Sequence, residues 1–91
     1  MGYMKDKIGT PAMYEQLAEE CTELAQASLK MARILRKENP TPKTSAEVLA
    51  NIVEEVSDIA LCLKELEIYP DHFIIERKLN RFKERWGGKE R

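Results

Sequence analysis

The sequence predicts an all-α protein, a small antiparallel helical bundle of three main helices that dimerisation completes. Two observations lead to this fold class. Apolar residues recur at alternating steps of three and four along three segments, and helix-starting or helix-breaking residues separate those segments. The 91 residues are expected to form a single domain. We divide it into an N-terminal arm at 1–10 and helices at 11–37, 44–67 and 70–86.

The first predicted helix begins at Thr10-Pro11, which offers an N-cap followed by proline at the first helical position. It is expected to end near Lys37, because the following ENPTPK contains two prolines and an asparagine. Its expected core positions are Met13, Leu17, Cys21, Leu24, Ser28, Met31 and Leu35, of which Ser28 is the one polar member.

The second predicted helix begins at a capping box, in which Thr44 and Glu47 satisfy each other's backbone amides. Its expected core positions are Leu49, Ile52, Val56, Ile59, Leu63 and Leu66. The third predicted helix follows the break at Tyr69-Pro70-Asp71 and ends at Gly87-Gly88. Its apolar positions are Ile75, Leu79, Phe82 and Trp86.

Composition argues against several classes of function. Fifteen basic and 16 acidic residues give a net charge of −1, so no global positive field is available to bind a long nucleic acid. No apolar run approaches the roughly 20 residues that span a bilayer, and MGYMKDKIGT lacks the apolar stretch of a signal peptide. We therefore expect a cytoplasmic protein with no membrane partner. Cys21 and Cys62 lack CxxC spacing and are interpreted as small apolar residues of a reduced protein.

Two acidic pairs at i and i+3 lie on the first two predicted helices. If the expected core positions point inward, Glu20 lies roughly 60° and Glu23 roughly 120° from the core direction. On the second helix, Glu55 lies roughly 100° and Asp58 roughly 160° from it. Four carboxylates converging between antiparallel helices would repel, and Mg²⁺, with Mn²⁺ as the alternative, is a cation that prefers such oxygens. Di-iron bundles use Glu-x-x-His pairs, whereas the one histidine, His72, lies outside both helices.

Either acidic motif alone also fits a solvated helix flank, but the ordered set is more informative. EQLAEECTELAQASLK at 15–30, followed by EEVSDIALCL at 54–63, resembles the MazG-like family of all-α nucleoside triphosphate pyrophosphohydrolases, whose hallmark is ExxE on one helix and ExxD on the next. KLNRFKERW at 78–86 resembles the basic C-terminal helix of short, phage-type members. The sequence departs from the family in a long interval between the acidic motifs and in Ser57, where glycine is frequent.

The resemblance implies magnesium-dependent cleavage of an NTP or dNTP to the monophosphate and pyrophosphate. By matching positions, it implies that Glu20, Glu23, Glu55 and Asp58 bind the metal and carry out catalysis. Two other interpretations remain open. One is a non-catalytic nucleotide-binding or protein-interaction module with a degenerate site, and the other is a metal-binding structural bundle without nucleotide chemistry.

Basic side chains are the expected contacts for the phosphates of a nucleotide. The candidates are Lys78 and Arg81 on the third helix, with Asn80 as a polar contact and Lys30 as a weaker candidate. A solvated basic flank that favours a helix C-terminus is the alternative for the third helix. Three helices would leave the acidic site open on one side, so we expect a homodimer or higher homo-oligomer whose second subunit covers it.

Overall fold

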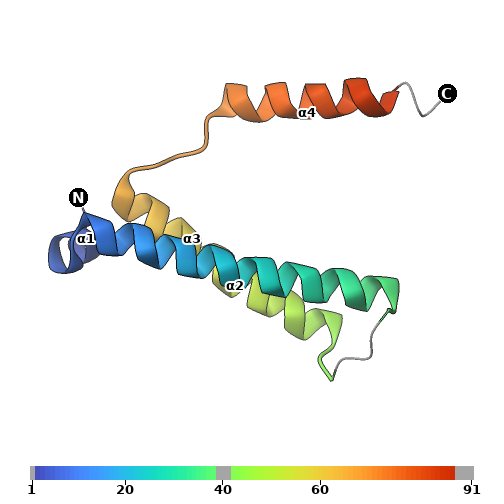
Figure 1. Ribbon diagram of the computed structural model, residues 1–91, viewed down its shortest axis with the longest axis horizontal. Coiled ribbons are helices and arrows are strands. Elements are labelled where there is room, and N and C mark those ends of the chain that lie inside the picture. Colours follow the sequence, from blue (N-terminus) through green and yellow to red (C-terminus); the bar gives the residue numbers. More distant parts are fainter. Residues whose placement is uncertain (1, 39–41, 88–91) are drawn as a thin grey trace.

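The computed structural model describes residues 2–38 and 42–87, which form four α-helices and their connections (Figure 1). The helices are α1 at Tyr3–Ile8, α2 at Thr10–Arg36, α3 at Ser45–Leu66 and α4 at His72–Gly87. No strand occurs within the described ranges, so the all-α prediction is confirmed. The three long helices begin and end within two residues of the expected ranges. Residues 39–41 of the ENPTPK break, and the second glycine of the Gly87-Gly88 stop, lie outside the described residues.

The N-terminal segment, expected to be an arm, contains the short helix α1. Gly9 joins α1 to α2 with a φ of 90°, a backbone conformation that glycine adopts at little cost. Gly9 therefore takes the N-cap position of α2, and Thr10, the expected N-cap, is already the first helical residue. Pro11 follows in the first turn, where its missing amide costs no hydrogen bond.

Side chains at the starts of α3 and α4 satisfy backbone amides that the helices leave without partners. The predicted capping box of α3 is confirmed: the Glu47 amide donates to Thr44 Oγ1 at 3.1 Å, and the Thr44 amide donates to Glu47 Oε1 at 2.9 Å. Before α4, Asp71 Oδ1 accepts hydrogen bonds from the amides of Phe73 at 2.8 Å and Ile74 at 3.1 Å. These caps explain why α3 begins directly after Thr44 and α4 directly after Asp71.

Helices α2 and α3 lie side by side in antiparallel directions, and α1 packs across both near the start of α2 (Figure 1). A side-chain hydrogen bond links α1 to α3. Glu65 of α3 is buried, and its Oε1 accepts a 2.7 Å hydrogen bond from the Lys5 amide in the first turn of α1. A carboxylate at a helix N-terminus is stabilised by the helix dipole. Gly2 approaches Glu65 so closely that a Cβ atom at this position would lie 2.9 Å from Oε1.

The seam between α2 and α3 follows a heptad spacing and contains glutamate at its centre. On α2 it runs through Met13, Glu20 and Ala27, and on α3 through Val48, Glu55 and Cys62. Met13 and Val48 are fully buried. The seam is thus rotated, by about 60° on α2 and 100° on α3, from the inward direction expected from the sequence.

The rotation changes which residues are buried. Val56 was expected to point inward, yet 48% of its surface is exposed, and the expected core residues Cys21 and Ser28 are exposed as well. The physical reason is that each apolar stripe is wider than the single seam that one partner helix can cover. The edge of each stripe that lies next to the acidic residues is buried between α2 and α3, and the other edge of each stripe is exposed to solvent.

Helix α4 stands apart from this pair (Figure 1). Among residues 2–38 and 42–87, it packs against none of the other three helices. Its apolar residues Ile75, Leu79, Phe82 and Trp86 are all exposed, although the rings of Phe82 and Trp86 stack with centroids 5.8 Å apart. The expected three-helix bundle therefore contains α2 and α3, joined by α1, but not α4. Within the described ranges, no helix is long and apolar enough to cross a membrane.

Candidate metal centre

Glu20 lies in the middle of the α2–α3 seam and is only 8% exposed. It is held there because Met13, one heptad earlier, anchors the same face of α2. Its Oε1 accepts a 3.0 Å hydrogen bond from the side-chain Nε2 of Gln16, one turn before it. Gln16 thus orients a carboxylate that the helix pair has removed from water.

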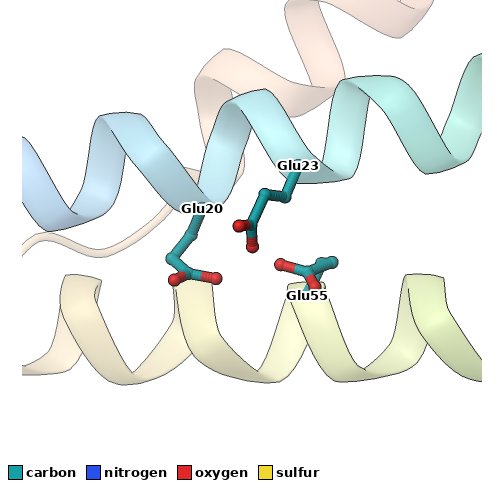
Figure 2. A group of neighbouring side chains, drawn as sticks. All are labelled: Glu20, Glu23 and Glu55. Atoms are coloured by element: carbon teal, nitrogen blue, oxygen red, sulfur yellow. The ribbon is translucent and has the colours of Figure 1, made fainter.

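Glu23 and Glu55 join Glu20 to form the acidic cluster. Each of the three offers a carboxylate oxygen, and these oxygens all lie within 4.8 Å of one another. Figure 2 shows Glu20 and Glu23 reaching from α2 towards α3, and Glu55 pointing from α3 towards Glu23. Burial decreases from Glu20 through the half-buried Glu55 to the exposed Glu23. The cluster therefore opens to solvent at Glu23.

Two oxygens of the cluster have no hydrogen-bond donor within the described part of the chain. They are Oε2 of Glu20 and Oε2 of Glu55, and both atoms are buried. A buried carboxylate oxygen without a donor or a cation costs free energy, because it has lost its water. Neither a Lys nor an Arg forms an ion pair with these three carboxylates among the described residues. The interpretation of the acids as a flank paired with basic side chains does not fit Glu20 and Glu55.

The cluster shifts the proton affinity of its members. Burial, followed by hydrogen-bonding contacts and repulsion from Glu23 and Glu20, raises the pKa of Glu55 to about 7. The contact with Glu55 acts to lower the pKa of Glu20, but burial, Glu23 and Asp58 together raise it. The metal-free cluster therefore retains a proton near neutral pH, which a bound divalent cation would displace.

Asp58, the fourth predicted ligand, lies next to the cluster and is half-buried. Its carboxylate is close enough to Glu20 to raise the pKa of that residue by hydrogen bonding and by charge, but it is not among the three whose oxygens lie within 4.8 Å. Ser57, which stands where the resembled family often has glycine, donates from Oγ to the Val53 carbonyl at 2.7 Å. The serine hydroxyl is satisfied within α3 and exposed, so it does not intrude on the cluster.

A hollow of about 250 Å³ adjoins the acidic cluster. Glu23 and Glu55 form one part of its lining, and Lys30, a predicted substrate contact, forms another. Gln26 and Asn51 complete the polar lining and were not predicted as site residues. Their spacing offered a signal, because Gln26 lies one turn after Glu23 and Asn51 one turn before Glu55.

The other predicted substrate contacts lie elsewhere. Lys78, Asn80 and Arg81 are exposed on α4, which does not contact the helices that carry the acids. Asn80 and Arg81 line a separate surface hollow of about 390 Å³, to which α4 alone contributes residues. The structure thus brings Lys30 to the acidic cluster but not the basic residues of α4.

The chemistry of this donor set fits a hard divalent cation. Carboxylate oxygens from two helices converge, some without partners, and nitrogen or sulfur ligands are absent from the described cluster. We compared the chain with family models, curated proteins and solved structures, and none of the three comparisons found a match.

Proposed function

We propose that the chain is a magnesium-dependent nucleotide pyrophosphohydrolase that cleaves an NTP or dNTP to the monophosphate and pyrophosphate. Glu20, Glu23 and Glu55 are the proposed metal ligands, and Asp58 is the proposed fourth. Mn²⁺ is the alternative ion. The observation that carries the proposal is the pair of buried carboxylate oxygens, on Glu20 and Glu55, that have no donor within the described residues.

The acidic cluster by itself would repel a polyphosphate, since substrate and site are both negative. A bound Mg²⁺ would offset this repulsion and polarise the phosphate oxygens. Gln16 keeps one oxygen of Glu20 occupied, so that the other is left for a ligand. The gradient from buried Glu20 to exposed Glu23 supports entry of substrate at the Glu23 end.

The hollow beside the cluster supports the choice of a phosphorylated substrate. Lys30 supplies a positive charge there, while the amides of Gln26 and Asn51 can both donate and accept hydrogen bonds. In the proposed reaction, a water molecule attacks the α-phosphorus, and the bond from this phosphorus to the oxygen that bridges the α and β phosphates breaks. A carboxylate of the cluster accepts the proton of the water, and pyrophosphate leaves as an anion.

Lys78, Arg81 and Asn80 remain proposed substrate contacts, on the condition that α4 of this chain or of a second copy reaches the hollow. Their net positive charge complements a polyphosphate. We propose a homodimer as the working form and the cytosol, which holds nucleoside triphosphates, as its location.

The test is to incubate the pure protein with a panel of NTPs and dNTPs in Mg²⁺ and to separate the products by ion-exchange chromatography. We expect a monophosphate and pyrophosphate in equal amounts. Glu20→Gln and Asp58→Asn should abolish turnover, whereas Glu19→Gln, on the exposed side of α2, should leave it intact. Orthophosphate as the direct product would contradict the proposal.

The non-catalytic alternative gives a different result in the same experiment. A degenerate nucleotide-binding module would produce heat in titration calorimetry with a nucleotide and Mg²⁺ but would form no product. A purely structural metal site would bind Mg²⁺ or Mn²⁺ without nucleotide. Calorimetry beside the product assay therefore separates the three functions.

A further inference from the structure

The α2–α3 pair has two chemically different faces, one on each side of the seam. We call one the apolar face and define it by Tyr14, Cys21 and Ser28 of α2 with Leu49, Val53 and Val56 of α3. All six residues are exposed, with 58% of Val53 and 50% of Tyr14 accessible to solvent. The opposite side, the acidic face, carries the mouth of the glutamate cluster.

Helix geometry places the two stripes of the apolar face on the same side. Taking Glu20 as the seam direction of α2, Tyr14 and Cys21 lie about 100–120° in one sense of rotation, and Glu23 lies about 60° in the other. Because α2 and α3 are antiparallel, the same sense of rotation on each helix leads to the same side of the pair.

On α3, with Glu55 as the seam direction, Leu49 and Val56 lie about 100–120° in the first sense, while Asn51 and Asp58 lie about 40–60° in the second. The hollow at the cluster, which Lys30 and Asn51 line together, confirms that the second sense points to one common side. The apolar face is therefore continuous across the seam and points away from the hollow.

Charge is completely segregated between the two faces. From Tyr14 to Ala32 on α2, and from Leu49 to Leu63 on α3, no charged residue lies on the apolar side. The charged residues of both stretches lie on the acidic side, such as Glu19 and Glu54. In a two-fold dimer each patch meets its own copy, so an uncharged face can associate with itself whereas an acidic face would repel itself.

The exposed area matches what a stable dimer needs. The chain exposes 7519 Å², about 2,100 Å² more than the roughly 5,400 Å² expected for a compact monomer of its 10.5 kDa mass. Its radius of gyration is 17.2 Å, where about 12 Å is expected for 91 residues. Obligate homodimers bury roughly 2,000–5,000 Å² in total from both partners. The excess is of that size, and the apolar face and α4, which packs against no other described helix, both contribute to it.

We propose that the apolar face is a homodimer interface, on which two α2–α3 pairs pack face to face as a four-helix bundle with the acidic clusters on the outside. The occupant is a second copy of the chain, since an uncharged face can meet its own copy without repulsion and the chain exposes more surface than a compact monomer of its mass. This interface does not cover the hollow at Glu23, so a second subunit could reach the cluster only through α4. The proposal does not rest on nucleotide hydrolysis, and its test contains neither metal nor nucleotide.

The test is sedimentation equilibrium of the full chain between about 0.1 and 100 μM. We expect a mass of about 21 kDa, twice that of one chain. Val53→Glu should raise the dissociation constant of the dimer at least about 100-fold, because the charge would be buried at the interface. Leu61→Glu is the matched control: Leu61 is a similarly exposed apolar residue of α3, but it lies on the side of Glu54 and should leave the dimer intact.

A second measurement needs no variant and guards against misfolding of Val53→Glu. The exposed Cys21 lies on the apolar face, so its alkylation rate should fall as the wild-type protein is concentrated into the dimer. A monomer at 100 μM, or a dimer that Val53→Glu leaves intact while Cys21 stays reactive, would overturn the proposal. A compact monomer with a radius of gyration near 12 Å by X-ray scattering would instead assign the face to α4 of the same chain.

Discussion

The α2–α3 pair and helix α4 distribute apolar and charged residues in opposite ways. At the seam of the pair, Glu20 is 8% exposed while Val56, in the middle of α3, is 48% exposed. On α4 the charged and apolar residues are alike exposed, and Trp86 keeps 47% of its surface in solvent. A chain selected only for the stability of the isolated monomer would bury the valine and the tryptophan and expose the glutamate.

The comparison teaches that the described residues of the two regions carry different kinds of unsatisfied surface, each of which suits a different kind of partner. The seam has buried negative charge, which a cation would neutralise. Helix α4 and the apolar face have uncovered hydrocarbon, which another protein surface would cover. Experiments that add or remove each kind of partner therefore test whether the two regions differ in this way.

The largest effect is expected from truncation within the seam. Met13→Ala removes a fully buried side chain and should lower the free energy of unfolding by about 2–5 kcal/mol. Phe82→Ala on α4 should cost less than about 0.5 kcal/mol when unfolding is measured at concentrations where the chain is monomeric. Urea denaturation followed by circular dichroism measures both values. Similar losses for the two variants would mean that α4 is packed in solution.

Metal binding should have the next largest effect. Free Mg²⁺ at about one hundred times its dissociation constant should raise the free energy of unfolding by about 2.7 kcal/mol. Glu55→Gln should abolish most of this gain, and Glu54→Gln, its exposed neighbour on α3, should retain it. Thermal melts with and without Mg²⁺ test the difference. Equal stabilisation of both variants would rule out Glu55 as a ligand.

A smaller effect is expected from pH in the absence of metal. The pKa of Glu55 is about 7 in the folded chain and 4.5 as an ordinary glutamate, so the folded state binds more protons in between. The stability that this proton contributes is fully present below pH 4.5 and is lost as pH rises through about 7. Relative to Glu55→Gln, the wild type should therefore become less stable across this window in melts with chelator. If the wild type instead became more stable than Glu55→Gln as the pH rises, the pKa of Glu55 would not be raised in the folded state.

The smallest expected effect concerns the end of α3. Glu67 adopts the left-handed conformation with φ 58°, which costs a side-chain-bearing residue free energy that glycine avoids. Glu67→Gly should therefore raise the free energy of unfolding by up to about 1 kcal/mol. Lys64→Gly, inside the same helix, should lower it by about as much. Loss of stability in both variants would mean that the backbone conformation at Glu67 is not strained.

Local signals in the sequence predicted the elements of this fold well. The capping box at Thr44 and the break at Tyr69-Pro70-Asp71 depend on nearest neighbours, and the structure has helix ends at both. Periodicity alone could not predict which edge of a wide apolar stripe meets the partner helix. The edge that is buried depends on how the side chains of α2 and α3 fit together. For this reason Glu55, which was predicted to lie beside the core, lies in the seam.

The candidate site was predictable to a similar degree. The spacing of ExxE and ExxD identified the acids, and the antiparallel pairing brings three of them together. The place of α4 was not predictable, because a basic amphipathic helix looks the same whether it packs on its own chain or on another. Lys78 and Arg81 therefore stay predictions, whereas Lys30 has a place beside the cluster.

The hydrogen bond from the Lys5 amide to Glu65 makes the exchange rate of one amide hydrogen a measure of how α1 packs against α3. The first amides of a helix have no partner within it, so the Lys5 amide of α1 owes its protection to Glu65, 60 residues away. Its hydrogen exchange should follow the release of α1 from α3, separately from the unfolding of either helix. One resolved amide signal would thus measure how often the end of α3 and the start of the chain come apart.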